Sequence, residues 1–169
     1  MYNKKIAIVM MVLILFLSAC SATEEENIED AKQKVELSFE EPTKKRNEKA
    51  EGLSFYTPFR MKVVEETQNN LILEKGSNTY IMFYNRNEDE ESTLLYELSK
   101  EGQSDFLIEE VYEGKERFGY FLVSEESHEN VQVIVGIGGS KITTITSMSD
   151  LPKTAELMMK MVSSIEFKK

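Results

Sequence analysis

The sequence has few of the residues on which disulfides, metal sites and nucleophilic catalysis depend. Its 169 residues include no tryptophan, one histidine (His128) and one cysteine (Cys20). A single cysteine excludes a disulfide within the chain. One histidine without a second thiol falls short of the three or four nitrogen or sulfur ligands of an ordinary zinc site. These absences leave Cys20 as the residue whose role has to be explained.

Cys20 directly follows the longest aliphatic run of the chain. Lys4 and Lys5 precede residues 6–19, and this apolar stretch is shorter than the roughly 20 residues of a membrane-spanning helix. The pattern is typical of a secretory signal peptide over residues 1–19. The stretch ends in Leu17-Ser18-Ala19-Cys20, which resembles the lipobox of bacterial lipoproteins. That resemblance implies cleavage before Cys20, a diacylglyceryl group on its thiol, and attachment to the extracytoplasmic face of a cell membrane. Frequent Lys, Glu, Ile and Asn suggest a Gram-positive host.

The predicted mature chain is strongly acidic. Removing residues 1–19 takes away two lysines and no acidic residue, which leaves 18 basic and 30 acidic side chains and a net charge of −12. Nucleic-acid binding depends on Lys and Arg contacts to phosphate, so we expect no nucleic-acid partner. The same charge rules out a polybasic membrane signal, and acyl chains on Cys20 must therefore supply the anchor.

The segment after Cys20 is polar, and we expect residues 20–51 to be a flexible tether. Residues 21–51 contain ten acidic and six basic side chains, a composition that buries too little apolar surface to offset the entropy of ordering. Such a tether spans roughly 30 Å. The spacing of Ile28, Ala31 and Val35 leaves open a helix over part of residues 24–34, and alternation at Val35, Leu37 and Phe39 leaves open a short strand.

Residues 52–169 have the apolar patterning of one domain. Alternation predicts strands over residues 59–63, 71–74, 79–84, 106–112, 117–124, 131–137 and 141–148, most of them joined by short turns. Helices are predicted after Ser92, ending at Gly102, and after Ser149 or Asp150, with Pro152 in the first turn. Residues 165–167 suit a short edge strand. We therefore expect an α+β fold with a mainly antiparallel sheet of six to seven strands packed by two helices.

The order of these elements resembles the PsbP-like fold. The resemblance rests on Leu53-Ser54-Phe55-Tyr56-Thr57-Pro58 at the start of the domain and on Ser163-Ser164-Ile165-Glu166-Phe167 at its end. It implies an α/β sandwich and an accessory or binding role, and it transfers no functional residue.

Four local patterns are candidate chemical sites, and each has a simpler structural interpretation. His128 with Glu126 or Glu129 suits a general base or a metal ligand, but the segment is more typical of a solvated hairpin loop. Ser140-Lys141 lacks the Ser-x-x-Lys spacing, and the residues of a strand alternate between its faces. The glycines of residues 136–141 lack phosphate-loop spacing and predict a hairpin turn. The acidic run of residues 85–91 offers oxygen ligands for calcium but has no EF-hand spacing.

No catalytic set emerges, so we expect a non-enzymatic accessory lipoprotein without a cofactor that contacts an envelope protein. Met159 is predicted to lie off the apolar arc of the last helix and to be available to a partner. Two alternatives stay open. One is a carrier with an apolar pocket for a small ligand between sheet and helices. The other is a hydrolase that uses carboxylates alone, for which Glu65, Glu110 and Glu126 are candidates.

Overall fold

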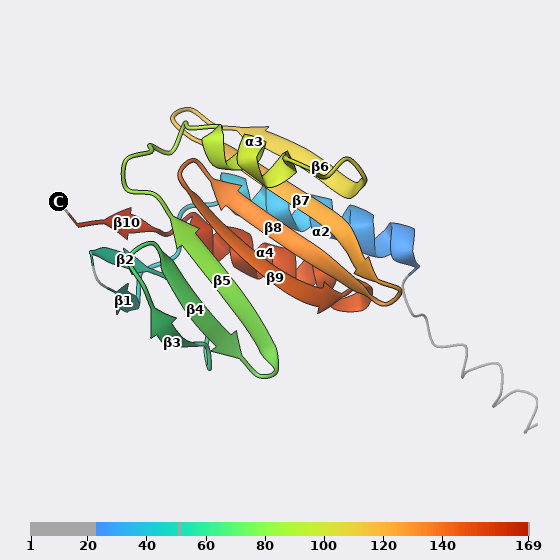
Figure 1. The fold of residues 1–169 in the computed structure, drawn as a ribbon, viewed down its shortest axis with the longest axis horizontal. Helices are drawn as coiled ribbons and strands as arrows, with labels where there is room; N and C mark the ends of the chain where they lie inside the picture. Colours follow the sequence, from blue (N-terminus) through green and yellow to red (C-terminus); the bar gives the residue numbers. More distant parts are fainter. Residues whose placement is uncertain (1–22, 51, 169) are drawn as a thin grey trace, which may run out of the picture.

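Alternating apolar residues build a seven-stranded antiparallel sheet in the computed structural model, which describes residues 23–50 and 52–168 (Figure 1). The sheet order is β3-β4-β5-β9-β8-β7-β6, so β9 is the central strand. The bounds are β3 (Lys62–Glu66), β4 (Asn70–Lys75), β5 (Asn78–Tyr84), β6 (Phe106–Glu113), β7 (Phe118–Ser127), β8 (Asn130–Ile137) and β9 (Ser140–Ser147). The predicted α+β class, with helices on a mainly antiparallel sheet, is confirmed.

The turn between β8 and β9 requires glycine. Gly138 has a φ of +51°, and a Cβ there would lie 2.1 Å from the backbone oxygen of Asp89. The Gly138 N–H donates to Phe118 O, and the Gly139 N–H donates to Asp89 O, at 2.9 and 3.1 Å. The glycine-rich segment is thus a hairpin turn, as predicted, and it holds the loop of residues 85–93 against the end of the sheet.

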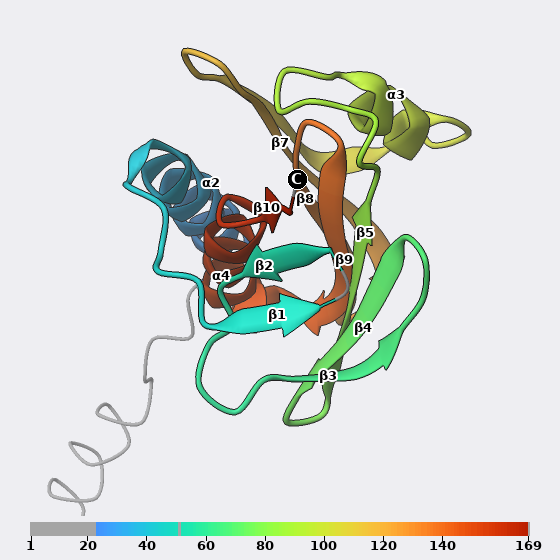
Figure 2. The same cartoon turned by 90° about the vertical axis from the view of Figure 1, so that its left-hand side faces the viewer.

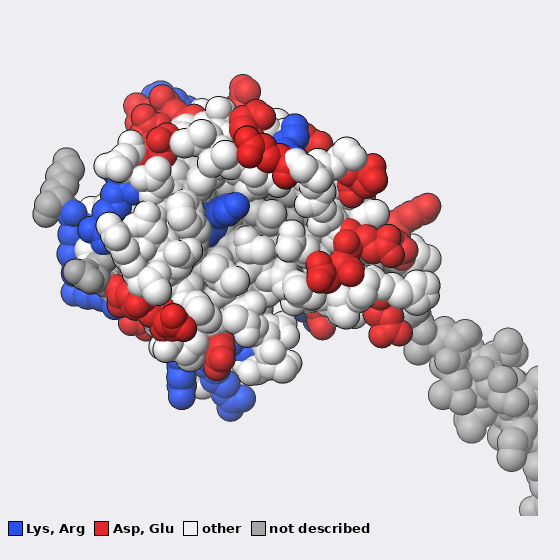
Figure 3. Space-filling model, in the orientation of Figure 1, with Lys and Arg blue, Asp and Glu red and all other residues white. Residues whose placement is uncertain are grey.

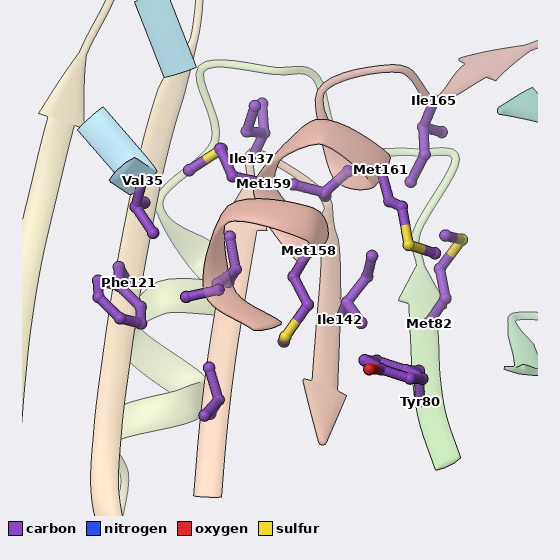
Figure 4. Packing of buried hydrophobic residues seen from close by; sticks show 14 of the residues in the cluster. Val35, Tyr80, Met82, Phe121, Ile137, Ile142, Met158, Met159, Met161 and Ile165 are labelled. Atoms are coloured by element: carbon purple, nitrogen blue, oxygen red, sulfur yellow. The ribbon is translucent and has the colours of Figure 1, made fainter. Parts of the chain in front are cut away.

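One face of the sheet is covered by the helix α4 (Leu151–Val162), which follows a short 3-10 turn at Met148–Asp150. The Ser147 hydroxyl accepts a hydrogen bond from the Asp150 N–H at the start of this segment. Alternate residues of β8 and β9, such as Val133 and Ile142, point toward α4 and are fully buried. Methionines of α4 fill the space between helix and sheet (Figure 4).

The predicted tether is wrong for residues 24–40, which form the helix α2 (Glu24–Glu40) and pack against α4 (Figure 2). Thr23 and Glu26 form a capping box: the Thr23 hydroxyl accepts from the Glu26 N–H at 3.2 Å, and the Glu26 carboxylate accepts from the Thr23 N–H at 2.8 Å. Ala31, Val35 and Phe39 are buried on one side of the helix. This single apolar stripe is enough to hold α2 in place, because α4 has apolar side chains toward α2 as well as toward the sheet.

Packing of α2 also overturns the prediction for Met159. Its side chain is fully buried, because α2 covers the side of α4 that the sheet leaves free. Figure 4 shows Met159 among core residues, with Val35 of α2 nearby. Met159 therefore belongs to the core and offers no partner surface.

A small second sheet closes one end of the molecule. Its order is β1-β2-β10, with β1 (Glu48–Ala50), β2 (Leu53–Phe55) and β10 (Glu166–Phe167) paired antiparallel. The predicted edge strand at residues 165–167 is thus present as β10. The tether prediction is wrong for β1 as well, because this strand pairs with β2. The described chain begins with α2 at one end of the long axis and finishes with β10 at the other (Figure 1).

The helix α3 (Leu94–Lys100) lies on the opposite face of the main sheet. Leu95 packs there in a second, smaller apolar cluster with Tyr120, Leu122 and Ile134 of β7 and β8. α3 is only seven residues long, so it covers this face over β7 and β8 and leaves the side of β4 and β5 open.

Candidate functional site

The uncovered half of the main sheet carries exposed apolar side chains where a solvent-facing sheet normally carries polar ones. Ile81 of β5 and Ile145 of β9 are 47% and 49% exposed. Ile81 pairs across the strands with Ile72 and with Thr143, so branched side chains form a continuous row over β4, β5 and β9. We call this half of the sheet the open face.

The open face has a shallow hollow between β5 and β9. Its volume is about 380 Å³. Isoleucine, threonine and amide side chains form its walls, namely Ile81, Thr79, Gln132, Thr143 and Ile145. Figure 3 shows the centre of this side of the molecule as largely uncharged, with a basic side chain inside it and acidic side chains toward the margins. The shape and composition suit contact with another surface better than enclosure of a small ligand.

Lys141 stands at the boundary between the covered and the open halves. It lies on the central strand β9, paired with Phe83 of β5 and with Gly136 of β8. Its ammonium donates a hydrogen bond to the Ser99 hydroxyl of α3 at 2.8 Å. Partial burial lowers the pKa of Lys141, because the charged form loses part of its hydration. Among the described residues, no carboxylate lies within ion-pair distance of it.

Tyr120 lies under α3, on the other side of Gly136 from Lys141. Its ring passes over Gly136, where a Cβ would come within 2.2 Å of the ring, so glycine is required at that position. The Tyr120 hydroxyl is buried and has no hydrogen-bond partner among the described residues. Burial raises the pKa of Tyr120, and the nearby Ser99 hydroxyl only partly opposes that shift. Tyr120 is therefore neutral at physiological pH and gives Lys141 no counter-charge.

The histidine segment lies at the end of the molecule where α2 begins, in a hollow separate from the one on the open face. His128 is exposed in the turn between β7 and β8 and lines a hollow of about 260 Å³ with Glu24 and Glu129. Within residues 23–50 and 52–168, no group of three or more His, Cys, Asp or Glu residues is arranged to hold a metal ion. The structure thus brings His128 close to acidic residues without assembling a ligand set.

Ser140 and Lys141 point to opposite faces of β9, as expected for neighbours in a strand. Ser140 is buried on the α4 side, whereas Lys141 contacts α3 on the other side. The acidic residues 85–91 form the loop before α3. Asp89 there accepts a hydrogen bond from the Glu91 N–H at 3.0 Å, and Glu88 accepts one from the Ser92 hydroxyl. Both carboxylates thereby stabilise the loop.

The three candidate carboxylates are not brought together. Glu65 lies in β3 and Glu110 in β6, the two outer strands of a seven-stranded sheet. Six strand spacings of roughly 4.8 Å separate them by about 29 Å, whereas glycosidase pairs lie within about 10 Å. Glu110 also forms an ion pair with Lys32 of α2 at 2.7 Å. Glu126 is exposed near the end of β7, about 17 Å along the strand from the partner of Glu110, Phe121.

The predicted signal peptide and Cys20 lie outside the described residues. Among the helices in the described ranges, none has the length and apolar character needed to cross a membrane.

Comparisons with known proteins give no family. No family model matches the sequence, and no curated protein matches it. Among solved structures, the chain is similar to a protein from Bacteroides thetaiotaomicron VPI-5482, with a TM-score of 0.35 and 10% sequence identity. The match covers 69% of this chain and 45% of the other, so this chain spans less than half the length of that protein.

The residues that define the open face were not singled out from the sequence, although a signal for them exists. Tyr80-Ile81-Met82-Phe83-Tyr84 is apolar at every position, whereas a strand with one solvated face alternates. Such a run indicates that both faces of β5 contact other groups. The sequence distinguishes Lys141 only as the neighbour of Ser140, because its lack of a carboxylate partner among the described residues is visible only in three dimensions.

Proposed function

We propose that this protein is a lipid-anchored accessory protein of the cell envelope that binds a neighbouring protein through the open face. The observation that carries the proposal is the row of half-exposed isoleucines on the half of the sheet that α3 leaves uncovered. Exposed apolar patches rimmed by polar residues are typical of protein interaction sites. The Leu17-Ser18-Ala19-Cys20 motif supports the anchor.

The start of α2 sets how close the domain lies to that anchor. Thr23 caps the helix, only three residues after Cys20. Three residues extend to at most about 11 Å, in place of the roughly 30 Å predicted for a flexible tether. The end formed by the first turn of α2 and the β7–β8 turn is therefore held near the membrane. The open face runs along the side of the molecule (Figure 1), where a membrane-bound neighbour can reach it.

The packing of the core favours a protein partner over a small ligand. A ligand carrier would need an apolar pocket between sheet and helices. That space is occupied by side chains such as Met158, Met161 and Ile142, which are fully buried (Figure 4). The hollow on the open face is shallow and encloses little of a drug-sized molecule.

Site-specific photo-crosslinking in native membranes tests the proposal. A photoreactive residue replaces Ile145 in the full-length chain, and the matched control places it at Leu37, which is 52% exposed on α2. We expect a discrete crosslinked protein from position 145, absent from position 37 and lost when Cys20→Ala removes the anchor. The same products from both positions, or none from position 145, would refute the proposal.

A further inference from the structure

Lys141 is the exception among the partly buried lysines of the described residues. The other four, Lys32, Lys34, Lys100 and Lys160, each pair with a carboxylate, on Glu110, Asp30, Glu109 and Glu156 respectively. Within the described part of the chain, Lys141 has only the neutral Ser99 hydroxyl as a hydrogen-bond partner, at 2.8 Å. A cation that has lost hydration without gaining an opposite charge is costly, and proteins normally pair such groups.

The Lys141 ammonium lies close to the apolar side chains of the open face. Lys141 and Thr143 are two residues apart on the same side of β9. The Lys141 side chain therefore leaves the strand about 7 Å from Thr143, which lines the hollow. Phe83 flanks Lys141 on the neighbouring strand, and Ile81 flanks Thr143. A group that settled on the isoleucines would therefore also reach Lys141.

We propose that the polypeptide segment bound by the open face presents an Asp or Glu carboxylate to Lys141, with apolar side chains beside it that cover Ile81 and Ile145. This inference rests on the proposed function and names the chemistry of the partner. It follows from charge complementarity: the carboxylate would give Lys141 the partner that the other four partly buried lysines already have.

Two other occupants fit this surface less well. A second copy of the chain docked face to face with the two Lys141 side chains opposed would bring like charges together, and like charges at an interface oppose association. A fatty acid also carries a carboxylate, but its chain needs an enclosed cavity, and the hollow of about 380 Å³ is shallow. A polypeptide segment can cover a shallow surface and supply both the charge and the apolar contacts.

The test begins with the segment crosslinked from position 145, which mass spectrometry identifies. A labelled synthetic peptide of that sequence, and a counterpart with its acidic residue changed to the amide, are titrated against the full-length lipidated protein in detergent by fluorescence anisotropy. We expect the crosslinked segment to contain an acidic residue flanked by apolar ones. We expect the amide peptide to bind about tenfold more weakly than the acidic peptide. In Lys141→Met the two peptides should bind equally, whereas Lys141→Arg should restore the difference.

The outcomes separate the two claims. A crosslinked segment without an acidic residue, equal binding of both peptides to the wild type, or discrimination that persists in Lys141→Met would overturn the inference and leave the proposed partner binding in place. Crosslinking to a lipid or to a second copy would also overturn it. Failure to obtain any crosslink specific to position 145 would remove the proposed function, and the inference with it. Thermal unfolding of Lys141→Met confirms that the variant is folded.

Discussion

Replacing Phe39 by alanine tests whether α2 is part of the folded domain. Phe39 is 4% exposed, its ring lies 5.6 Å from the ring of Tyr112, and the Arg117 guanidinium lies 4.4 Å from its centroid. Removing a buried phenylalanine side chain costs about 3–5 kcal/mol. We expect the free energy of unfolding to fall by about 4 kcal/mol. At a urea dependence of about 2 kcal/mol per molar, the midpoint falls by about 2 M.

The matched control is Leu37→Ala on the same helix. Leu37 is 52% exposed, so its truncation should change the unfolding free energy by at most about 0.5 kcal/mol. Both variants are compared by urea unfolding of residues 21–169, followed by circular dichroism and tyrosine fluorescence. A flexible segment would give near-zero changes for both. Equal, small effects of Phe39→Ala and Leu37→Ala would refute the packing of α2 on the domain.

Gly119 supplies a second, independent check of the same contact. A Cβ at Gly119 would lie 2.7 Å from the Phe39 ring, so Gly119→Ala forces the ring aside. In the Phe39→Ala background the clash disappears, and the cost of Gly119→Ala should fall by at least about 1 kcal/mol. Additive costs in the double variant would show that the ring of Phe39 does not rest on β7.

Three further changes test separate parts of the structure and of the proposal. Cys20→Ala should abolish incorporation of radiolabelled palmitate; label equal to wild type would disprove the lipobox assignment. Thr23→Ala removes the capping box and should lower unfolding free energy by about 1 kcal/mol, measured by urea unfolding, with Thr23→Ser close to wild type. Lys141→Met should raise the melting temperature near pH 7, because it removes a partly desolvated charge. Since burial lowers the pKa of Lys141, the unfolded chain binds the proton more tightly, and wild-type stability rises with pH between the lowered folded pKa and the unfolded value. The advantage of Lys141→Met should therefore shrink as pH approaches about 10.4; an advantage independent of pH would contradict this.

The strands and the last helix were predictable because their apolar residues repeat with the period of the structure. Val131, Val133 and Val135 alternate, and all three are buried on the α4 side of β8. The strand β3 departs from its prediction, because it begins at Lys62 rather than at residue 59. The Met61 N–H donates to Pro58 O in a turn there, and Arg60 has a φ of +68°.

The helix α2 was only an alternative to the predicted tether, because composition averages over a segment. Its buried residues Ala31, Val35 and Phe39 recur four apart, but charged residues between them keep the mean hydropathy low. Whether so few apolar residues can order a helix depends on the surface against which they pack. α4 meets it with buried methionines, and the burial of Met159 is part of that same contact. Tertiary packing outweighs composition here.

Under the proposed function, the unpaired charge of Lys141 and the short link between the domain and its anchor act together. An open face with a few isoleucines and one cation would bind a free partner in solution only weakly, because association costs translational and rotational freedom. Confinement to the same membrane removes part of that cost. Thr23 follows Cys20 by only three positions, which keeps the face close to the membrane. A stronger, permanently apolar surface would be unnecessary there and would expose an exported protein to aggregation.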